Sequence, residues 1–353
     1  MLLQGIFPPI TTPFYPDGNV YFKKLEHNVE RYSKTPIAGL VVLGSTGESI
    51  MLSDEERRQV LKTSREVAAP NKVLIAGTGI ESAAETLRLT EYAAKLGYDV
   101  VLVRTPHFYK KQMQPANMLA FYRTMADRSP LPLMIYNVPP FTGYDIPADV
   151  VIELAEHPNI IGLKESSGDV EKVRQMVEAT RHVKRLATVS ETFDAVTPRM
   201  LKGSAENGQG GELVPVSALG SAKPSSAAVS VVSGIKTRQK EVGFQILVGA
   251  AQKLEPSLQV GAVGAILAFA DVAPTACYEI YTAWKEGNID LARMKQDRIT
   301  NAAQRVGSEL GIPGLKYGMD LNGYFGGLAR LPLLPLTAAL KTEVEGLLVH
   351  IKN

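Results

Sequence analysis

One lysine stands at the polar end of a short apolar run, in Ile160-Ile161-Gly162-Leu163-Lys164-Glu165. The apolar residues predict a buried strand, and residues 166–169 predict the turn that starts a helix. A lysine at the carboxyl end of such a strand is expected to be partly desolvated, which favours its neutral amine. A neutral amine is the species that attacks a ketone to form a Schiff base. The alternative is a surface lysine that only caps the strand.

Two further strand ends carry residues suited to the same chemistry. Val41-Val42-Leu43-Gly44-Ser45-Thr46-Gly47 runs from an apolar strand into hydroxyl residues between glycines. Glycines let the backbone approach a ligand closely, and the N–H groups of such a turn form a nest for a carboxylate. Leu133-Met134-Ile135-Tyr136 ends another predicted strand with a tyrosine, which can carry protons in a dry pocket. Taken singly, each of these two features is more often structural than catalytic.

Together and in this order, the three segments resemble the signature of the dihydrodipicolinate synthase / N-acetylneuraminate lyase superfamily of class I aldolases. The resemblance runs from Gly5 to about Pro335, with one interruption. It implies that Lys164 forms an imine with pyruvate or another 2-oxo acid. The protonated imine would then stabilise the enamine that forms when the C3–C4 bond breaks. It also implies that Tyr136 shuttles protons, and that the turn of Ser45, Thr46 and Gly47 binds the substrate carboxylate.

The resemblance implies further site residues. Thr46 would link Tyr136 to a second tyrosine in a proton relay. The segment Arg104-Thr105-Pro106-His107-Phe108-Tyr109 resembles the Thr-Pro-aromatic-aromatic turn of the family, whose tyrosine reaches a neighbouring subunit's site. Tyr109 is the candidate, with Phe108 as the alternative register, and His107 would replace a non-catalytic residue. Ile266, on the last predicted strand, is a further candidate for contact with the substrate.

Two departures from relatives bear on the substrate. Dihydrodipicolinate synthases carry an arginine for the carboxylate of aspartate semialdehyde where this chain has Phe141. Sialic acid lyases bind the glycerol tail through an Asp-Glu pair where this chain has Ala250-Ala251. We therefore expect cleavage of a 4-hydroxy-2-oxo acid such as 4-hydroxy-2-oxoglutarate, or of a 2-keto-3-deoxy sugar acid, to pyruvate or glyoxylate plus an aldehyde or 2-oxo acid. The resemblance is greatest to eukaryotic 4-hydroxy-2-oxoglutarate aldolase and 2-keto-3-deoxy sugar-acid aldolases. The alternatives are a dihydrodipicolinate synthase or sialic acid lyase, and an inactive barrel that binds 2-oxo acids.

Strand-like and helix-like segments alternate along the chain, which predicts a (β/α)8 TIM barrel rather than an open sheet. The predicted strands are 5–10, 39–43, 73–76, 100–103, 133–136, 160–164, 244–248 and 262–267. The barrel is expected to occupy residues 1–287, with an additional helical region at 288–353. Ser53 with Glu56, and Ser82 with Glu85, have the spacing of capping boxes at helix starts.

Residues 182–243 interrupt the barrel between its sixth helix and seventh strand. Residues 190–202 could form a helix, whereas 203–234 are rich in Gly, Ser and Ala and predict an irregular loop. The segment is either a lineage-specific insertion or a translated intron. Because helix-to-strand loops lie on the amino-terminal face of a barrel, we expect it to be far from Lys164.

Composition limits the possible partners and cofactors. With 38 basic and 36 acidic residues and a net charge of +2, the chain offers no electrostatic reason to expect nucleic acid or a membrane as a partner. No run approaches the roughly twenty apolar residues of a membrane span. A strand predicted this close to the start leaves no room for a signal, so we expect a cytoplasmic protein, mitochondrial only if a targeting segment is missing. We also expect a homo-oligomer, dimer or tetramer, without cofactor or metal, since the five histidines show no ligand spacing and an imine replaces a Lewis acid.

Overall fold

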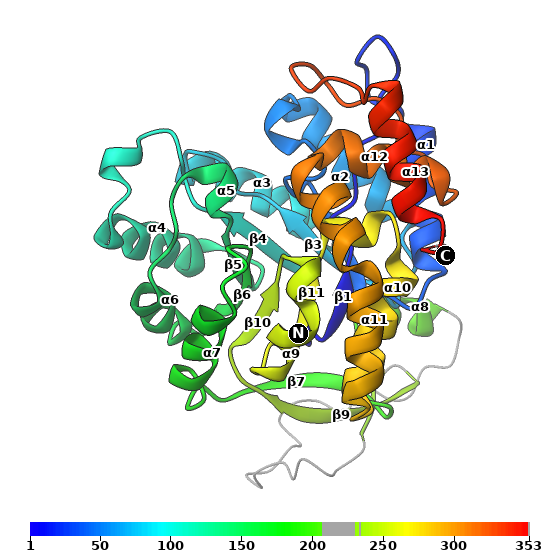
Figure 1. Cartoon of the computed structure of the whole chain (residues 1–353). Helices are drawn as coiled ribbons and strands as arrows, with labels where there is room; N and C mark the ends of the chain where they lie inside the picture. The colour runs from blue at the N-terminus through cyan, green and yellow to red at the C-terminus, as the bar shows by residue number, and fades with distance from the viewer. Residues whose placement is uncertain (207–229, 233, 352–353) are drawn as a thin grey trace, which may run out of the picture.

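An eight-stranded parallel sheet, with strand order β1-β11-β10-β6-β5-β4-β3-β2, forms the centre of this computed structural model (Figure 1). The structure describes residues 1–206, 230–232 and 234–351. Hydrogen bonds of 3.0 Å from Ala38 N–H to the Ile6 carbonyl and from Val41 N–H to the Pro8 carbonyl join the first strand to the second and close the barrel. All eight predicted strands are present, as β1 (Gly5–Phe7), β2 (Gly39–Val42), β3 (Val73–Gly77), β4 (Val100–Arg104), β5 (Leu133–Asn137), β6 (Ile160–Glu165), β10 (Gln245–Val248) and β11 (Gly264–Ile266).

A helix follows each strand and covers the outside of the barrel. The capping box predicted at Ser53 is confirmed, because its side chain accepts from Glu56 N–H while Glu56 accepts from Ser53 N–H. The box predicted at Ser82 is wrong, since Ser82 caps no N–H and Glu85 pairs with Arg88 instead. The surrounding helices are α1 (Phe22–Ser33), α2 (Asp54–Val67), α3 (Ala83–Leu96), α4 (Pro115–Arg128), α6 (Ala148–Ala155), α7 (Val170–Ala179), α9 (Leu254–Gln259) and α10 (Pro274–Lys285).

Alternate residues of the strands fill the interior of the barrel. One buried cluster contains Val41, Ile75, Leu102, Leu247 and Ile266, each no more than 2% exposed. Because side chains alternate between the two faces of a strand, the next inward position lies two residues further along each strand. This apolar cluster therefore fills the barrel below and around the polar side chains at the carboxyl ends of the strands, with Leu247 level with Lys164.

Additional helices follow the barrel, as predicted for the carboxyl-terminal region. They are α11 (Ile289–Ala302), a π-helical turn (Ala303–Glu309), α12 (Gly311–Leu321) and α13 (Ala338–Leu348), drawn in orange to red in Figure 1. Helix α11 packs along α10, and α13 packs on α12. Within the described part of the chain, no helix has the length and apolar character needed to cross a membrane.

The interruption contains more regular structure than its composition predicts. Strand β7 (Arg185–Ser190) pairs antiparallel with β9 (Ile235–Val242), which also pairs with β8 (Ser230–Val232). A helix is present, but α8 (Pro198–Glu206) begins later than expected. The prediction that 203–234 is irregular is therefore wrong at the end of α8 and at β8. Its remaining part, 207–229 and 233, lies outside the described residues.

The small sheet lies at the amino-terminal end of the barrel, as expected. Lys240 Nζ donates to Gln4 Oε1 at 2.8 Å, just before β1. Ala187 and Val189 of β7 form a buried cluster with Leu2. Figure 1 shows β7 and β9 beside the amino terminus, below the barrel strands. The described part of the interruption is thus on the face opposite the carboxyl ends of the strands.

Candidate active site

Three polar residues stand in a row at the carboxyl ends of adjacent strands. The register pairs Arg104 of β4 with Tyr136 of β5, and Tyr136 with Lys164 of β6. Paired residues of neighbouring strands point to the same face of a sheet, and Tyr136 belongs to the buried cluster inside the barrel. All three side chains therefore begin on the inner side of the barrel, at the end where barrel enzymes carry their active sites.

Lys164 and Tyr136 are in contact. The Lys164 Nζ lies 4.2 Å from the centre of the Tyr136 ring, and the two side chains are almost fully buried. The Tyr136 hydroxyl lies 3.3 Å from Ser45 Oγ. An amine enclosed beside a phenol has both the nucleophile and the proton carrier that imine formation requires. The structure thus brings together Lys164, Tyr136 and Ser45, which the sequence predicts as site residues.

The turn after β2 is held in an unusual backbone conformation. Leu43 and Glu48, on either side of it, have positive φ angles of 64° and 54°. The N–H groups of Gly47 and Glu48 donate to the carbonyls of Gly44 and Ser45. A side chain at Gly47 would place Cβ 3.0 Å from the Ile10 carbonyl oxygen, so the close packing favours glycine here. Strained backbone of this kind is common where a ligand is bound.

Two N–H groups of the turn are available to a ligand. Among the hydrogen bonds of the described residues, none is made by the N–H of Ser45 or of Thr46. With the Ser45 hydroxyl beside them, they form the kind of nest that binds a carboxylate. Thr46 is 8% exposed, and no hydrogen bond joins its hydroxyl to Tyr136 in the described structure. The relay through Thr46 stays a prediction.

A polar network supports Lys164 from the next position of its strand. The Asn137 amide donates to both oxygens of Glu165 at 2.9 Å and to Asp145 Oδ1 at 2.6 Å. Lys172 of α7 lies 3.4 Å from Glu165 Oε2 and also pairs with Asp145. These contacts tie β5 to β6 directly beside Tyr136 and Lys164, so the network fixes the spacing of the two strand ends.

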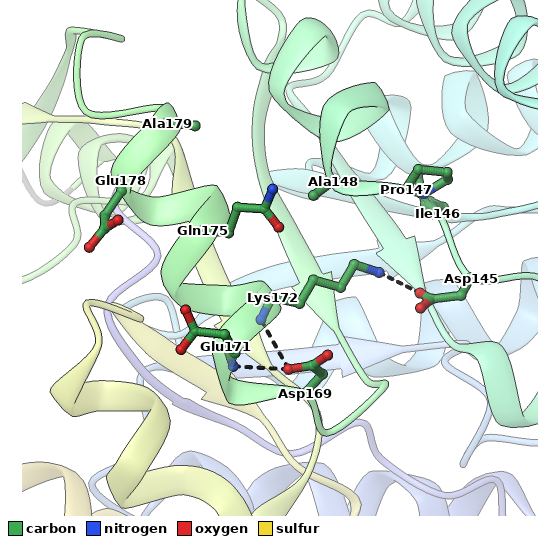
Figure 2. Close-up of a pocket in the computed structure, with 10 residues that line it drawn as sticks. All are labelled: Asp145, Ile146, Pro147, Ala148, Asp169, Glu171, Lys172, Gln175, Glu178 and Ala179. Carbon is green, nitrogen blue, oxygen red and sulfur yellow. Dashed lines mark hydrogen bonds and ion pairs between the residues drawn. The ribbon is translucent and has the colours of Figure 1, made fainter.

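A hollow of about 810 Å³ beside this network contains a different lysine. Figure 2 shows Lys172 pointing to Asp145 across it, with Asp169 on the turn before α7. None of the predicted site residues lines this hollow. Because the Lys172 amine is held in ion pairs, it is a poor nucleophile, and we place the candidate site at Lys164.

The other predicted residues are more dispersed. Ile266 is fully buried in the same inner cluster as Tyr136. Tyr109 and Phe108 are 67% and 74% exposed, so this loop is accessible to another molecule. The ring nitrogen Nδ1 of His107 lies 2.5 Å from Glu81 Oε1, so this nitrogen already has a partner and the histidine has a structural role. No group of metal-ligating side chains is found in the described part of the chain.

Two residues near the site were missed in the sequence. Arg104 follows Leu102 by two positions, and a charge at an inward position of an apolar strand was the available signal. Asp271, after β11, is fully buried and neither carboxyl oxygen has a hydrogen-bond partner. Burial raises the pKa of Asp271 well above its usual value, and the charge of Lys164 opposes that shift. No local pattern distinguishes this aspartate from one on a surface turn.

Comparison with known sequences identifies relatives over the whole chain. The model of the dihydrodipicolinate synthetase family matches residues 2–211 and 206–351. A protein of Methanothrix thermoacetophila named 4-hydroxy-tetrahydrodipicolinate synthase is 28% identical over 352 residues, covering 100% of this chain and 98% of the relative. A protein of the same name from Haloarcula marismortui is 38% identical over 178 residues, covering 50% of this chain and 57% of the relative.

Solved structures share the fold. The chloride-inhibited dihydrodipicolinate synthase of Acinetobacter baumannii, complexed with pyruvate, superposes with a TM-score of 0.76 at 27% identity, covering 99% of this chain and 98% of that one. The 4-hydroxy-tetrahydrodipicolinate synthase of Methylacidiphilum fumariolicum gives a TM-score of 0.75 at 26% identity, covering 99% and 96%. The match over both full lengths includes the barrel and the carboxyl-terminal helices.

Proposed function

The chain belongs to the dihydrodipicolinate synthetase family, and we propose that it is a carbon–carbon lyase that binds a 2-oxo acid as a Schiff base on Lys164. The chain is therefore an enzyme of a lyase family. The observation that carries the proposal is the buried contact between the Lys164 amine and Tyr136, whose hydroxyl faces Ser45. The related synthase complexed with pyruvate supports a 2-oxo acid as the ligand.

Each side chain then has a distinct role. The Lys164 amine attacks the C2 carbonyl and releases water as the imine forms. Tyr136 transfers protons to and from the reacting oxygen, with Ser45 as its hydrogen-bond partner. The free N–H groups of Ser45 and Thr46 bind the 2-oxo acid's carboxylate, and Gly47 permits the tight turn. Ile266, which is buried in the same inner cluster as Tyr136, contributes apolar lining.

Two reactions are candidates for the second substrate. The names of the relatives support a 4-hydroxy-tetrahydrodipicolinate synthase better than the cleavage of a 4-hydroxy-2-oxo acid that we expected from the sequence. Phe141 is the observation that favours cleavage, because it replaces the arginine expected in a synthase and is 69% exposed. Because the relatives' names outweigh this single position, we propose the synthase reaction first and the cleavage of a 4-hydroxy-2-oxo acid second.

Reduction with borohydride in the presence of pyruvate tests the shared step. It should add one pyruvyl group at Lys164, and Lys164→Ala should abolish both the adduct and turnover. Lys62→Ala, which changes an exposed lysine of α2, is the matched control and should retain both. An adduct on another lysine, or turnover by Lys164→Ala, would refute the assignment. Rates with aspartate semialdehyde plus pyruvate, and with 4-hydroxy-2-oxoglutarate alone, then separate the two candidate reactions.

The exposed aromatic loop fits a contact between subunits. Phe108 and Tyr109 pack edge to face, with ring centres 5.2 Å apart, and both are largely exposed. Aromatic residues are enriched at protein interfaces, so the proposed function includes a homo-oligomer in which this loop meets a second copy. Light scattering should show a smaller particle for Tyr109→Ala than for the wild type. A cytoplasmic location remains a prediction of the sequence.

A further inference from the structure

A cavity of about 350 Å³ lies beside the candidate site and contains two arginines. Arg57 of α2 and Arg104 of β4 both line it. A much smaller cavity adjoins it, lined by Ser45 and Tyr136, and Arg104 contributes to both. Arg104 and Ser49 are side chains that line both cavities, and Arg104 is the charged one of the two.

The Arg104 guanidinium is fixed by one of its nitrogens. Its Nη1 donates to Glu81 Oε1 at 3.0 Å and to the Thr105 carbonyl at 3.2 Å, and lies 2.7 Å from His107 Nδ1. Among the described residues, no hydrogen bond is made by Nε or Nη2. A Cβ at Gly79 would lie 2.5 Å from the Arg104 backbone nitrogen and 2.9 Å from its Cγ, so the close packing against Arg104 requires glycine. The side chain is thus held in place, and its Nε and Nη2 donors are available to a ligand.

Arg57 adds a second positive charge to the same cavity. Its Nε donates to the Ser49 carbonyl at 3.0 Å, and its two terminal nitrogens make no hydrogen bond within the described structure. Burial lowers the pKa of Arg57, and the nearby charge of Arg104 lowers it further. Glu81 is the carboxylate that lines the cavity, and it already pairs with Arg104 and accepts from the N–H groups of His107 and Phe108, so one carboxylate faces two arginines. An anion in the cavity would relieve the repulsion between the two arginines.

We propose that Arg104, assisted by Arg57, binds a carboxylate at the end of the substrate that lies away from Lys164. This inference rests on the proposed function and names the substrate class. Arg104 and Lys164 lie two strand spacings apart, on the order of 9–10 Å between Cα atoms, with Tyr136 between them. A 2-oxo acid bound at Lys164 would extend past Tyr136 and place a second carboxylate within reach of Arg104.

The second substrate is accordingly an aldehyde that itself carries a carboxylate. Aspartate semialdehyde and glyoxylate both meet this requirement, whereas a neutral sugar aldehyde would offer no charged acceptor to the Nε and Nη2 donors that Glu81 does not bind. Arg104 thus supplies the positive charge that Phe141 does not. This removes the argument from Phe141 against aspartate semialdehyde, and it disfavours the 2-keto-3-deoxy sugar acids.

Two 2-oxo acids of equal chain length provide the test. Borohydride trapping at Lys164 is measured against the concentration of 2-oxoglutarate, which has a distal carboxylate, and of 2-oxopentanoate, which has none. Arg104→Gln should raise the half-saturating concentration of 2-oxoglutarate roughly 10- to 100-fold, as for a lost charge-assisted hydrogen bond. The values for 2-oxopentanoate and pyruvate should change less than about twofold, because neither carries a distal carboxylate for the arginine to bind. Arg57→Gln should raise the half-saturating concentration of 2-oxoglutarate as well, but by a smaller factor.

Matched variants distinguish the effect of losing the Arg104 charge from a general loss of folding. Arg58→Gln, next to Arg57 on α2 but paired with Asp54, should leave all three values unchanged. Arg104→Lys keeps a charge, so its half-saturating concentration of 2-oxoglutarate should lie between those of the wild type and Arg104→Gln. This variant also tests the proposal if Arg104→Gln does not fold. The proposal would be overturned if Arg104→Gln raised the half-saturating concentrations of both five-carbon acids equally, or if it left that of 2-oxoglutarate unchanged.

Failure of the proposed function gives a different result. A wild-type protein that traps none of the three acids refutes the Schiff base, but not the arginine site. Glutarate binding measured by calorimetry needs no imine and tests the site in that case. Binding that weakens in Arg104→Gln supports the proposal, and a wild type that does not bind glutarate overturns it.

Discussion

Lys316 and Glu48 form a buried ion pair between the carboxyl-terminal helices and the candidate substrate turn. Their atoms Nζ and Oε1 lie 2.6 Å apart, and neither side chain is exposed. Lys316 Nζ also donates to the carbonyls of Thr12 and Leu328, at 2.9 and 2.8 Å. The second carboxyl oxygen of Glu48 accepts from the N–H of Arg330. Because Glu48 directly follows the turn, the pair helps to hold the turn's backbone in place.

The first prediction concerns the coupling of this pair. Burial lowers the pKa of Lys316, and Glu48 opposes that shift by favouring the charged amine. Removing one partner leaves an uncompensated buried charge, so Lys316→Met and Glu48→Gln should each reduce the free energy of unfolding by about 3–5 kcal/mol. The double variant should lose less than the sum. Urea unfolding of the four proteins measures this, and strictly additive losses would contradict the coupling.

The second prediction concerns Tyr136. If its hydroxyl transfers protons, Tyr136→Phe should form the pyruvate imine but turn over roughly a hundredfold or more slowly. Tyr98→Phe is the control, since Tyr98 is also buried but donates to the Leu61 carbonyl away from the site. Steady-state rates and borohydride trapping provide the two readings. A Tyr136→Phe enzyme within a few-fold of wild type would mean that the tyrosine only packs.

The third prediction concerns pH and Asp271. Burial raises the pKa of this carboxyl in the folded protein, so the folded state keeps a proton that the unfolded state releases. The free energy of unfolding should therefore fall as pH rises from about 4, the unfolded pKa, towards the folded pKa. Asp271→Asn removes the ionisation and should increase stability at neutral pH and flatten this dependence. The control is Asp297→Asn at an exposed position of α11.

Urea unfolding at several pH values measures the Asp271 effect. An Asp271→Asn protein with the same pH dependence as wild type would show that Asp271 does not carry the shift. A protein that is destabilised at every pH would show instead that the carboxyl has a bonding role in the folded state.

The barrel could be predicted because each strand has a local signal. The apolar runs at β2, β5 and β6 end in polar turns, and their bounds differ from prediction by one residue at most. Strand β1 ends at Phe7 rather than residue 10 because Pro8 and Pro9 cannot donate hydrogen bonds to a ladder. The candidate site residues were predicted from the strand ends, since the carboxyl ends of parallel strands meet on one face.

The small sheet had no such signal, and the charge of Arg104 at an inward strand position does not by itself indicate a role. Strand β9 carries charges along its length and pairs with β7 across a long stretch of chain, so neither periodicity nor a turn marks the pair. The importance of Arg104 depends on the cavity and on Arg57, which comes from a different helix. Relationships of this kind exist only once the chain is folded.

The last prediction concerns the interruption of the barrel. If residues 203–234 were the irregular loop that their composition predicts, a short turn could replace residues 203–240 without loss of stability, because loop closure costs little. The structure reverses the expectation for stability, since the replacement removes β8 and most of β9. Strand β7 would then lose its antiparallel partner from Ala187 to Ser190, at roughly 0.5–1.5 kcal/mol for each net backbone hydrogen bond.

The replacement should nevertheless retain pyruvate trapping at Lys164, because the small sheet contacts the amino-terminal end of the barrel and the lysine lies at the other end. Arg199→Ala is the companion variant, since Arg199 of α8 is buried and bonds the carbonyls of Ala69 and Lys72. It should be destabilised while still trapping pyruvate. Urea unfolding and mass spectrometry measure the two effects. Trapping lost in a folded replacement variant would place the interruption at the active site, and unchanged stability would show that β9 only covers the surface.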